Sequence, residues 1–253
     1  MLAANNHLFR FERPMTSSRF SLFCVLAVAA AGCKKDATFT EPIPPQAALH
    51  WVQAVPDTGA IDMRPVDIIT NAALMDAPFR ASNMFYQGID AGTRRIRAFM
   101  NSTDPAITGV PILDTVITLA ANAGYTLIHT GFARTGSTPG RILWVVPDTP
   151  TDPGAGQVSV RVVHAGVGLG NVDLNITRHA TDTLPDAPLV ASAAYQSVST
   201  YRVFGRDSVA ADSLRVVVTA AGTKAPVLVT INLPTGTAGT TTNNPIPGVR
   251  VAG

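Results

Sequence analysis

The chain repeats part of itself after 111 residues, and this internal repeat constrains the fold more than any other feature of the sequence. Residues 49–54 (LHWVQA) are similar to residues 160–165 (VRVVHA), and residues 59–63 (GAIDM) are similar to residues 170–174 (GNVDL) without a gap. A period of about 110 residues is too long for one unit of a solenoid and has the size of a small domain. We therefore expect two similar domains in tandem.

The two repeats differ in their number of strand patterns. The first repeat, residues 47–153, continues after its shared part with residues 124–131 (GYTLIHTG) and residues 141–146 (RILWVV), which both have strand-like compositions. The second repeat, residues 154–253, shows nothing similar after residue 233. We therefore expect an incomplete second domain with an exposed sheet edge near its C-terminal end, where unpaired strand edges are reactive.

Short apolar segments separated by Gly, Pro, Asp and Asn clusters indicate strands throughout both repeats. Residues 158–162 (VSVRV) alternate apolar and polar positions, and long amphipathic helical patterns are missing. Residues 68–75 are the exception, with room for one helical turn between strands. The pattern predicts an all-β protein with two tandem immunoglobulin-like or transthyretin-like antiparallel β-sandwich domains. In the weaker middle part of the repeat, Tyr86 aligns with Tyr195.

An export segment precedes the repeats. Three arginines are followed by the apolar residues 21–31, which are too few for a membrane-spanning helix of about 20 residues. Residues 26–33 (LAVAAAGC) resemble the lipobox of bacterial lipoprotein signal peptides. The resemblance implies that residues 1–32 are removed and that Cys33 carries acyl chains, which hold the protein to a membrane. The alternative is an ordinary signal peptide with a chance cysteine, and Met15 is an alternative start.

Residues 33–46 are expected to form a lipid-anchored linker, because residues 41–45 (EPIPP) favour an extended, semi-rigid chain. In such lipoproteins an aspartate after the cysteine favours retention at the inner membrane. Lys34 stands at this position, so we expect the outer membrane, with the protein facing the periplasm or the surface.

Composition excludes several classes of function. The two cysteines, Cys24 and Cys33, lie in the export segment and at its end, so the repeats contain no thiol for a disulfide, a nucleophile or a metal cluster. Residues 1–32 contain three arginines and one glutamate of the 19 basic and 17 acidic residues, which leaves 16 of each in the mature chain. A neutral mature chain argues against electrostatic binding of nucleic acids.

The repeated core resembles a family found in exported bacterial proteins, the domain of unknown function 4397. The family's signature is an alternating valine strand, a His-Ala step and a Val-Asp-Val step after a short gap. The second repeat keeps residues 160–165 (VRVVHA) and 172–174 (VDL), and the first repeat keeps residues 61–63 (IDM) with Gln53 in place of the histidine. The resemblance implies the fold and the export, often in tandem copies, and it implies no catalytic residue.

His164 and Asp173 lie nine residues apart around a glycine-rich turn at residues 166–170 (GVGLG). A catalytic or metal-binding interpretation pairs the two side chains across the turn, with His179 as a third ligand, because imidazole and carboxylate groups bind metals and transfer protons. A structural interpretation has His164 bonded to a backbone carbonyl and Asp173 capping the turn. We prefer the structural interpretation, because Gln53 occupies the position of His164 in the first repeat.

Two further groups are candidates for interaction. Asp62 and Asp173 are equivalent by repeat position, and neighbouring carboxylates can act as acid and base, but these two lie in different repeats with apolar neighbours. Arg95 and Arg97 share a strand face with Phe99 and are able to contact lipid headgroups or an acidic glycan. We prefer a solvated face that protects a strand edge. Nucleophile-elbow, phosphate-loop and zinc-protease motifs are missing.

Three functional hypotheses follow. The preferred one is a non-enzymatic, lipid-anchored cell-envelope module, which presents loops or sheet faces to an envelope protein or polysaccharide. The second is an envelope-polymer hydrolase with dispersed Asp and His residues, and the third is a small-ligand carrier with a cavity between sheets. The sequence predicts no catalytic residue, cofactor or metal, and it leaves the partner and the oligomeric state open.

Overall fold

The structure is a computed structural model that describes residues 43–68, 73–83, 85–150, 152–154, 157–205 and 214–232. The chain divides into two compact units, Met1–Ile43 and Pro44–Gly253, and all described secondary structure lies in the second. The elements are β1 Gln46–Gln53, β2 Ile61–Pro65, β3 Leu74–Ala77, β4 Gln87–Asp90, β5 Gly92–Met100, α2 Pro105–Thr108, β6 Pro111–Leu119, β7 Gly124–Thr130, β8 Ile142–Asp148, β9 Gln157–Val160, β10 Val172–Thr177, β11 Val190–Ala193, β12 Arg202–Gly205, β13 Arg215–Ala220 and β14 Val227–Asn232.

The predicted signal peptide, the lipidation site Cys33, most of the linker and the C-terminal residues 233–253 lie outside the described residues. The expected helical turn at residues 68–75 is described only at its ends, and residues 74–75 already belong to β3. Within the described ranges, no helix is long and apolar enough to cross a membrane.

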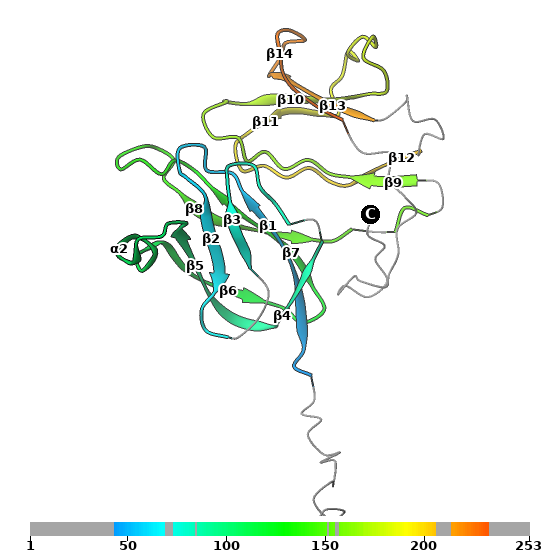
Figure 1. Ribbon diagram of the computed structural model, residues 1–253. Helices are drawn as coiled ribbons and strands as arrows, with labels where there is room; N and C mark the ends of the chain where they lie inside the picture. Colours follow the sequence, from blue (N-terminus) through cyan, green and yellow to red (C-terminus); the bar gives the residue numbers. More distant parts are fainter. Residues whose placement is uncertain are drawn as a thin grey trace, which may run out of the picture. The chain divides into compact units, whose positions relative to one another are not determined.

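The first repeat forms two four-stranded sheets, in the orders β4-β1-β7-β8 and β3-β2-β5-β6 (Figure 1). Alternate residues of each strand point to the space between the sheets, where Leu49 and Trp51 of β1 and Ile61 and Met63 of β2 are fully buried. The strands β5, β6 and β7 contribute further apolar side chains to the same core. This cluster is the larger of the two hydrophobic cores in the described chain.

The described strands of the second repeat have the same order as their counterparts. The sheet β11-β10-β13-β14 corresponds to β3-β2-β5-β6, and the two-stranded sheet β12-β9 corresponds to β4-β1. The register is also repeated: Ile61 pairs with Ala77 and Met100, and Val172, 111 residues later, pairs with Ala193 and Ala220. The internal repeat of the sequence is therefore a repeat of strand order.

The all-β prediction is confirmed, and one pairing adds a detail to it. Among the described strands, β1 and β7 pair in parallel, with Ala48 opposite Gly124 and Gln53 opposite His129, whereas the other pairings are antiparallel. The parallel pair arises because the chain leaves one sheet at the end of β6 and enters the other sheet at β7.

The predicted alignment of Tyr86 with Tyr195 is wrong. Gln87 pairs with Leu49 in β1, and Arg202 pairs with Val160, the counterpart of Leu49 in β9. The counterpart of Tyr86 is therefore Tyr201, the residue before Arg202. The connections before β4 and β12 differ in length between the two repeats. An alignment guided by residue type alone therefore placed Tyr195, and not Tyr201, opposite Tyr86.

The described part of the second repeat contains no counterpart of β7 and β8. β9 pairs only with β12 in this part of the chain, whereas β1 has a partner on each side. Within the described residues, the smaller core is therefore covered by fewer strands than the larger one.

Candidate functional site

Asp62 and Asp173 make the same backbone contact in the two repeats. Asp62 Oδ1 accepts the N–H of Asp76 at 3.0 Å, and Asp173 Oδ1 accepts the N–H of Ser192 at 2.7 Å. Asp76 and Ser192 have φ values of 48° and 49°, which is the left-handed conformation that non-glycine residues rarely adopt. Each carboxylate therefore holds an irregular position of the neighbouring strand, β3 or β11, where the ladder changes register.

His164 and Asp173 are held by separate backbone contacts. His164 Nδ1 accepts the N–H of Gly166 at 3.3 Å, which leaves Nε2 to donate to the carbonyl of Gly170 at 3.1 Å. Asp173 Oδ2 accepts the N–H of Gly222 at 2.8 Å in addition to its contact with Ser192. Both side chains are buried and closely engaged with the backbone.

Gln53, the counterpart of His164, makes an equivalent contact. Its Oε1 accepts the N–H of Val55, two residues later, at 3.3 Å. His179, considered as a third ligand, has its backbone N–H bonded to Asp182 Oδ2 at 2.8 Å. Across the described ranges, no group of three or more His, Cys, Asp or Glu residues is arranged to hold a metal ion.

Arg95 and Arg97 lie together on β5 and share one carboxylate of β6. Arg95 donates to both oxygens of Asp114 at 2.7 Å, and Arg97 Nε donates to Oδ2 at 2.9 Å. The hydrogen bonds from Arg95, together with those from Arg97, lower the pKa of Asp114 to about 2. Arg95, Arg97 and Asp114 form an exposed cluster with one net positive charge. The expectation that this face protects a strand edge is wrong, because β5 lies between β2 and β6.

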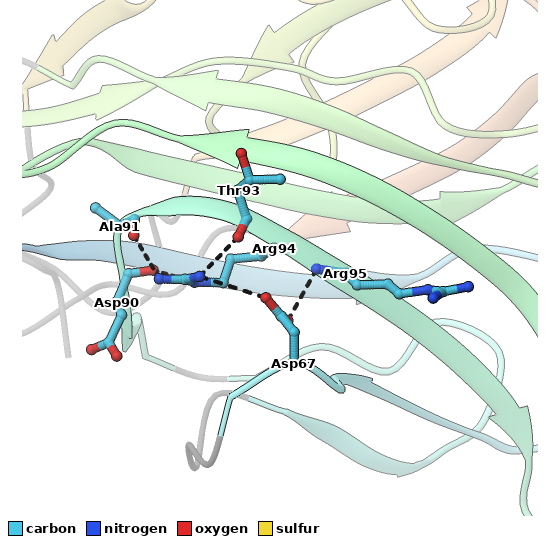
Figure 2. A network of polar contacts seen from close by, with 6 residues as sticks. All are labelled: Asp67, Asp90, Ala91, Thr93, Arg94 and Arg95. Atoms are coloured by element: carbon cyan, nitrogen blue, oxygen red, sulfur yellow. Dashed lines mark hydrogen bonds and ion pairs between the residues drawn. The ribbon is translucent and has the colours of Figure 1, made fainter.

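The neighbouring Arg94 closes the turn between β4 and β5 (Figure 2). Its guanidinium donates to the carbonyl oxygens of Asp90, Ala91 and Thr93 at 2.8, 2.6 and 2.8 Å. Asp67 contacts Arg94 Nη1 at 3.5 Å and accepts the backbone N–H of Arg95 at 3.0 Å. Arg94 is therefore a structural residue, because its donors are directed to backbone acceptors of its own turn.

A buried ion pair that the sequence did not reveal joins the two repeats. Asp148, at the end of β8, pairs with Arg161 Nη2, and the side chains are 1% and 12% exposed. Arg161 also donates to the carbonyl of Pro147 at 2.8 Å, and its guanidinium lies 5.0 Å from the ring centre of Tyr201. Asp148 Oδ2 accepts from Tyr86 Oη and from a threonine of β7, each at 2.8 Å.

The two tyrosines of this network are the repeat counterparts identified by register. Burial raises the pKa of Tyr86 to about 12, with a smaller contribution from Tyr201, and Arg161 opposes the shift. Both phenols are therefore neutral at physiological pH. A second contact between the repeats lies at the opposite end of β7, where Thr130 Oγ1 donates to the carbonyl of Ala165 at 3.0 Å. Neither contact could be predicted from the sequence, in which Arg161 is only a charged residue within the alternating pattern of residues 158–162.

The core of the first repeat also contains an unexpected polar group. His129 Nδ1 lies 3.0 Å from Gln53 Oε1, and both side chains are fully buried. Burial lowers the pKa of His129 to about 4, and Arg141 acts in the same direction. Three buried nitrogens, His129 Nε2, Gln53 Nε2 and Trp51 Nε1, have no hydrogen-bond partner among the described residues, which is uncommon in a protein interior.

The chain matches a known family. The domain of unknown function DUF4397 matches residues 47–175, just over half of the 253 residues. The chain belongs to the DUF4397 family. A search of curated proteins found no match.

The DUF4397 match begins in β1 and ends within β10, so it covers the complete first repeat and the beginning of the second. Asp62, Asp148, Arg161, His164 and Asp173 all lie within the matched residues. These five side chains hold strands, turns and the contact between the repeats. The polar residues singled out within the matched segment therefore have structural roles.

Proposed function

We propose that this DUF4397 protein is a lipid-anchored cell-envelope protein, a non-enzymatic module that binds an envelope protein or polysaccharide through its β-sandwiches. The observation that best supports this proposal is that the candidate reactive side chains form hydrogen bonds with the backbone. Asp62 and Asp173 accept backbone N–H groups at equivalent positions of the two repeats, and His164 accepts a backbone N–H as its counterpart Gln53 does. Since these side chains maintain strand irregularities and turns, the sheets and loops are the surfaces that remain for recognition.

The lipid anchor is proposed from the sequence alone. Cys33 ends an apolar segment of small residues, and a proline-rich linker separates it from β1. The full chain, produced in bacterial cells that process lipoproteins, should yield a mature protein that begins at Cys33 and has the mass of its acyl chains added. The Cys33→Ser variant is the matched control and should be unmodified. Intact-mass measurement of a wild-type chain without added lipid would contradict the anchor.

Binding is tested separately from anchoring. The soluble Cys33→Ser chain is used as bait in envelope extracts, with the same chain unfolded by heat as control. We expect a protein or a glycan to be enriched on the folded bait only. If quantitative proteomics and glycan analysis find no component enriched over the control, the binding module is contradicted.

One observation favours a second candidate, a small-ligand carrier. The second repeat contains an open cavity of about 380 Å³, whose lining includes Ile176, Phe204 and Leu214. This volume lies within the usual range of small-molecule sites, and its lining is mostly apolar. Native mass spectrometry of the purified chain should then show a co-purified molecule, and a spectrum of the ligand-free chain alone would remove this candidate.

A further inference from the structure

Equivalent core positions of the two repeats differ in burial. Leu49 and Trp51 of β1 are fully buried in the first repeat. Their counterparts, Val160 in β9 and Val162 after it, are only half-buried. The strand order around them is otherwise the same, so the difference comes from what covers these positions.

In the first repeat, the hairpin of β7 and β8 provides the cover. β7 pairs in parallel with β1 and places Leu127 opposite Trp51. Leu127 and, from β8, Leu143 pack into the same core. β8 also contacts β6, so the hairpin closes the space between both sheets on this side.

The second repeat exposes the corresponding face of β14 as well. Val229 and Ile231 pair with the core residues Val218 and Val216, yet they are 39% and 48% exposed. On β6, the register counterparts Leu113 and Thr115 are half-buried, and Ile117 on the same face is 9% exposed. Among the described strands, β9 therefore pairs along one edge only, and β14, at the end of the other sheet of this repeat, pairs only with β13 and has an exposed apolar face.

We propose that the second repeat binds a β-hairpin from a partner protein, which takes the place that β7 and β8 occupy in the first repeat. The first strand of that hairpin runs parallel to β9 and completes its sheet by backbone hydrogen bonds. Alternate apolar side chains of the hairpin cover Val160, Val162, Val229 and Ile231. This inference rests on the proposed binding function and names the class of its partner.

The choice of occupant follows from the chain itself. The first repeat shows which structure completes this fold, including the direction of the added strand and the apolar chemistry of its inner face. An open edge next to an apolar face is the arrangement that strand addition uses, since main-chain bonds supply affinity and alternate side chains supply specificity.

The test measures hydrogen–deuterium exchange of the full-length chain in detergent micelles, with and without a synthetic peptide of residues 122–148. This peptide contains β7, β8 and their connection. We expect it to slow exchange at the amides of β9 and β14 and to leave β1 unchanged, because β1 already pairs with its own β7. A control peptide with Leu127 and Leu143 replaced by Asp should have no effect.

Two variants locate the binding surface. Val229→Glu places a charge on the proposed apolar face and should weaken peptide binding at least about tenfold. Val116→Glu introduces the same change at an exposed position of β6 and should leave binding unchanged. Equal weakening by both variants, or no slowing of exchange at β9 and β14 at the highest soluble peptide concentration, would overturn the proposal.

Other occupants give different results. If β9 is protected without peptide and becomes exposed when residues 233–253 are deleted, the chain covers the edge itself and the proposal is wrong. Protection of β9 that appears only in a dimer identifies a second copy and also overturns it. Failure of the peptide while the pull-down still captures an envelope component removes the hairpin partner and leaves the proposed function standing.

Discussion

The carboxylate of Asp173 accepts the N–H of Ser192 in the same way that the carboxylate of Asp62 accepts the N–H of Asp76. Both acceptor–donor pairs join neighbouring strands at a residue with positive φ. Asp173 has an additional partner, the N–H of Gly222, so its two oxygens fix two separate segments of the second repeat.

The Asp173→Asn variant should lower the free energy of unfolding of the chain by about 1–3 kcal/mol, because one backbone N–H would face an amide NH₂ instead of an acceptor. Asp62→Asn is the matched variant and should cost less, since Asp62 accepts one backbone N–H from the described residues whereas Asp173 accepts two. Urea denaturation followed by circular dichroism measures both. Equal stability of wild type and Asp173→Asn would show that the contact is not stabilising.

Breaking the ion pair between the repeats should be costly. Arg161→Met leaves Asp148 buried without its cation, and we expect a loss of about 3–5 kcal/mol in unfolding free energy. The double variant Asp148→Asn/Arg161→Met should be more stable than the sum of the single effects predicts, because neither charge is then left unpaired. A double-mutant cycle from denaturation curves checks this. Additive effects would mean that the two side chains do not interact.

Stability should fall as the pH decreases from about 6.5 to about 4, because of His129. Burial lowers the pKa of this imidazole in the folded chain, whereas the unfolded chain keeps the ordinary value and binds a proton within this window. The stability is therefore complete above pH 6.5 and levels off below pH 4, with a loss of roughly 3 kcal/mol between them.

Denaturation at a series of pH values tests the role of His129 against two controls. His129→Gln should remove most of the pH dependence and leave the part that comes from His50, whose pKa burial also lowers. The matched variant His50→Gln should retain the larger part of the pH dependence, which comes from His129. A wild-type profile that is flat between pH 6.5 and pH 4 would contradict the assignment.

The different exposure of β6 and β14 predicts unequal costs for the same substitution on these equivalent strands. Ile117→Ala removes a buried side chain from β6 and should cost about 2–5 kcal/mol. Ile231→Ala removes a half-exposed side chain from β14 and should cost less than about 1 kcal/mol. Similar losses for both variants would show that Ile231 is covered in solution.

The sequence alone determined the strands and the repeat. The alternating pattern and the 111-residue offset identified the counterparts Ile61 and Val172, and the all-β class followed, because side-chain alternation is a local property of a strand.

Only the tertiary structure decided which distant residues meet. The equivalence of Tyr86 and Tyr201 in the two repeats depends on the lengths of the connections between strands, which residue types do not encode. The parallel pairing of β1 with β7, and the burial of Asp148 with Arg161, depend on where the chain crosses between sheets and how the repeats pack. These are non-local properties, because each contact is stabilised by many others that form together only in the folded chain.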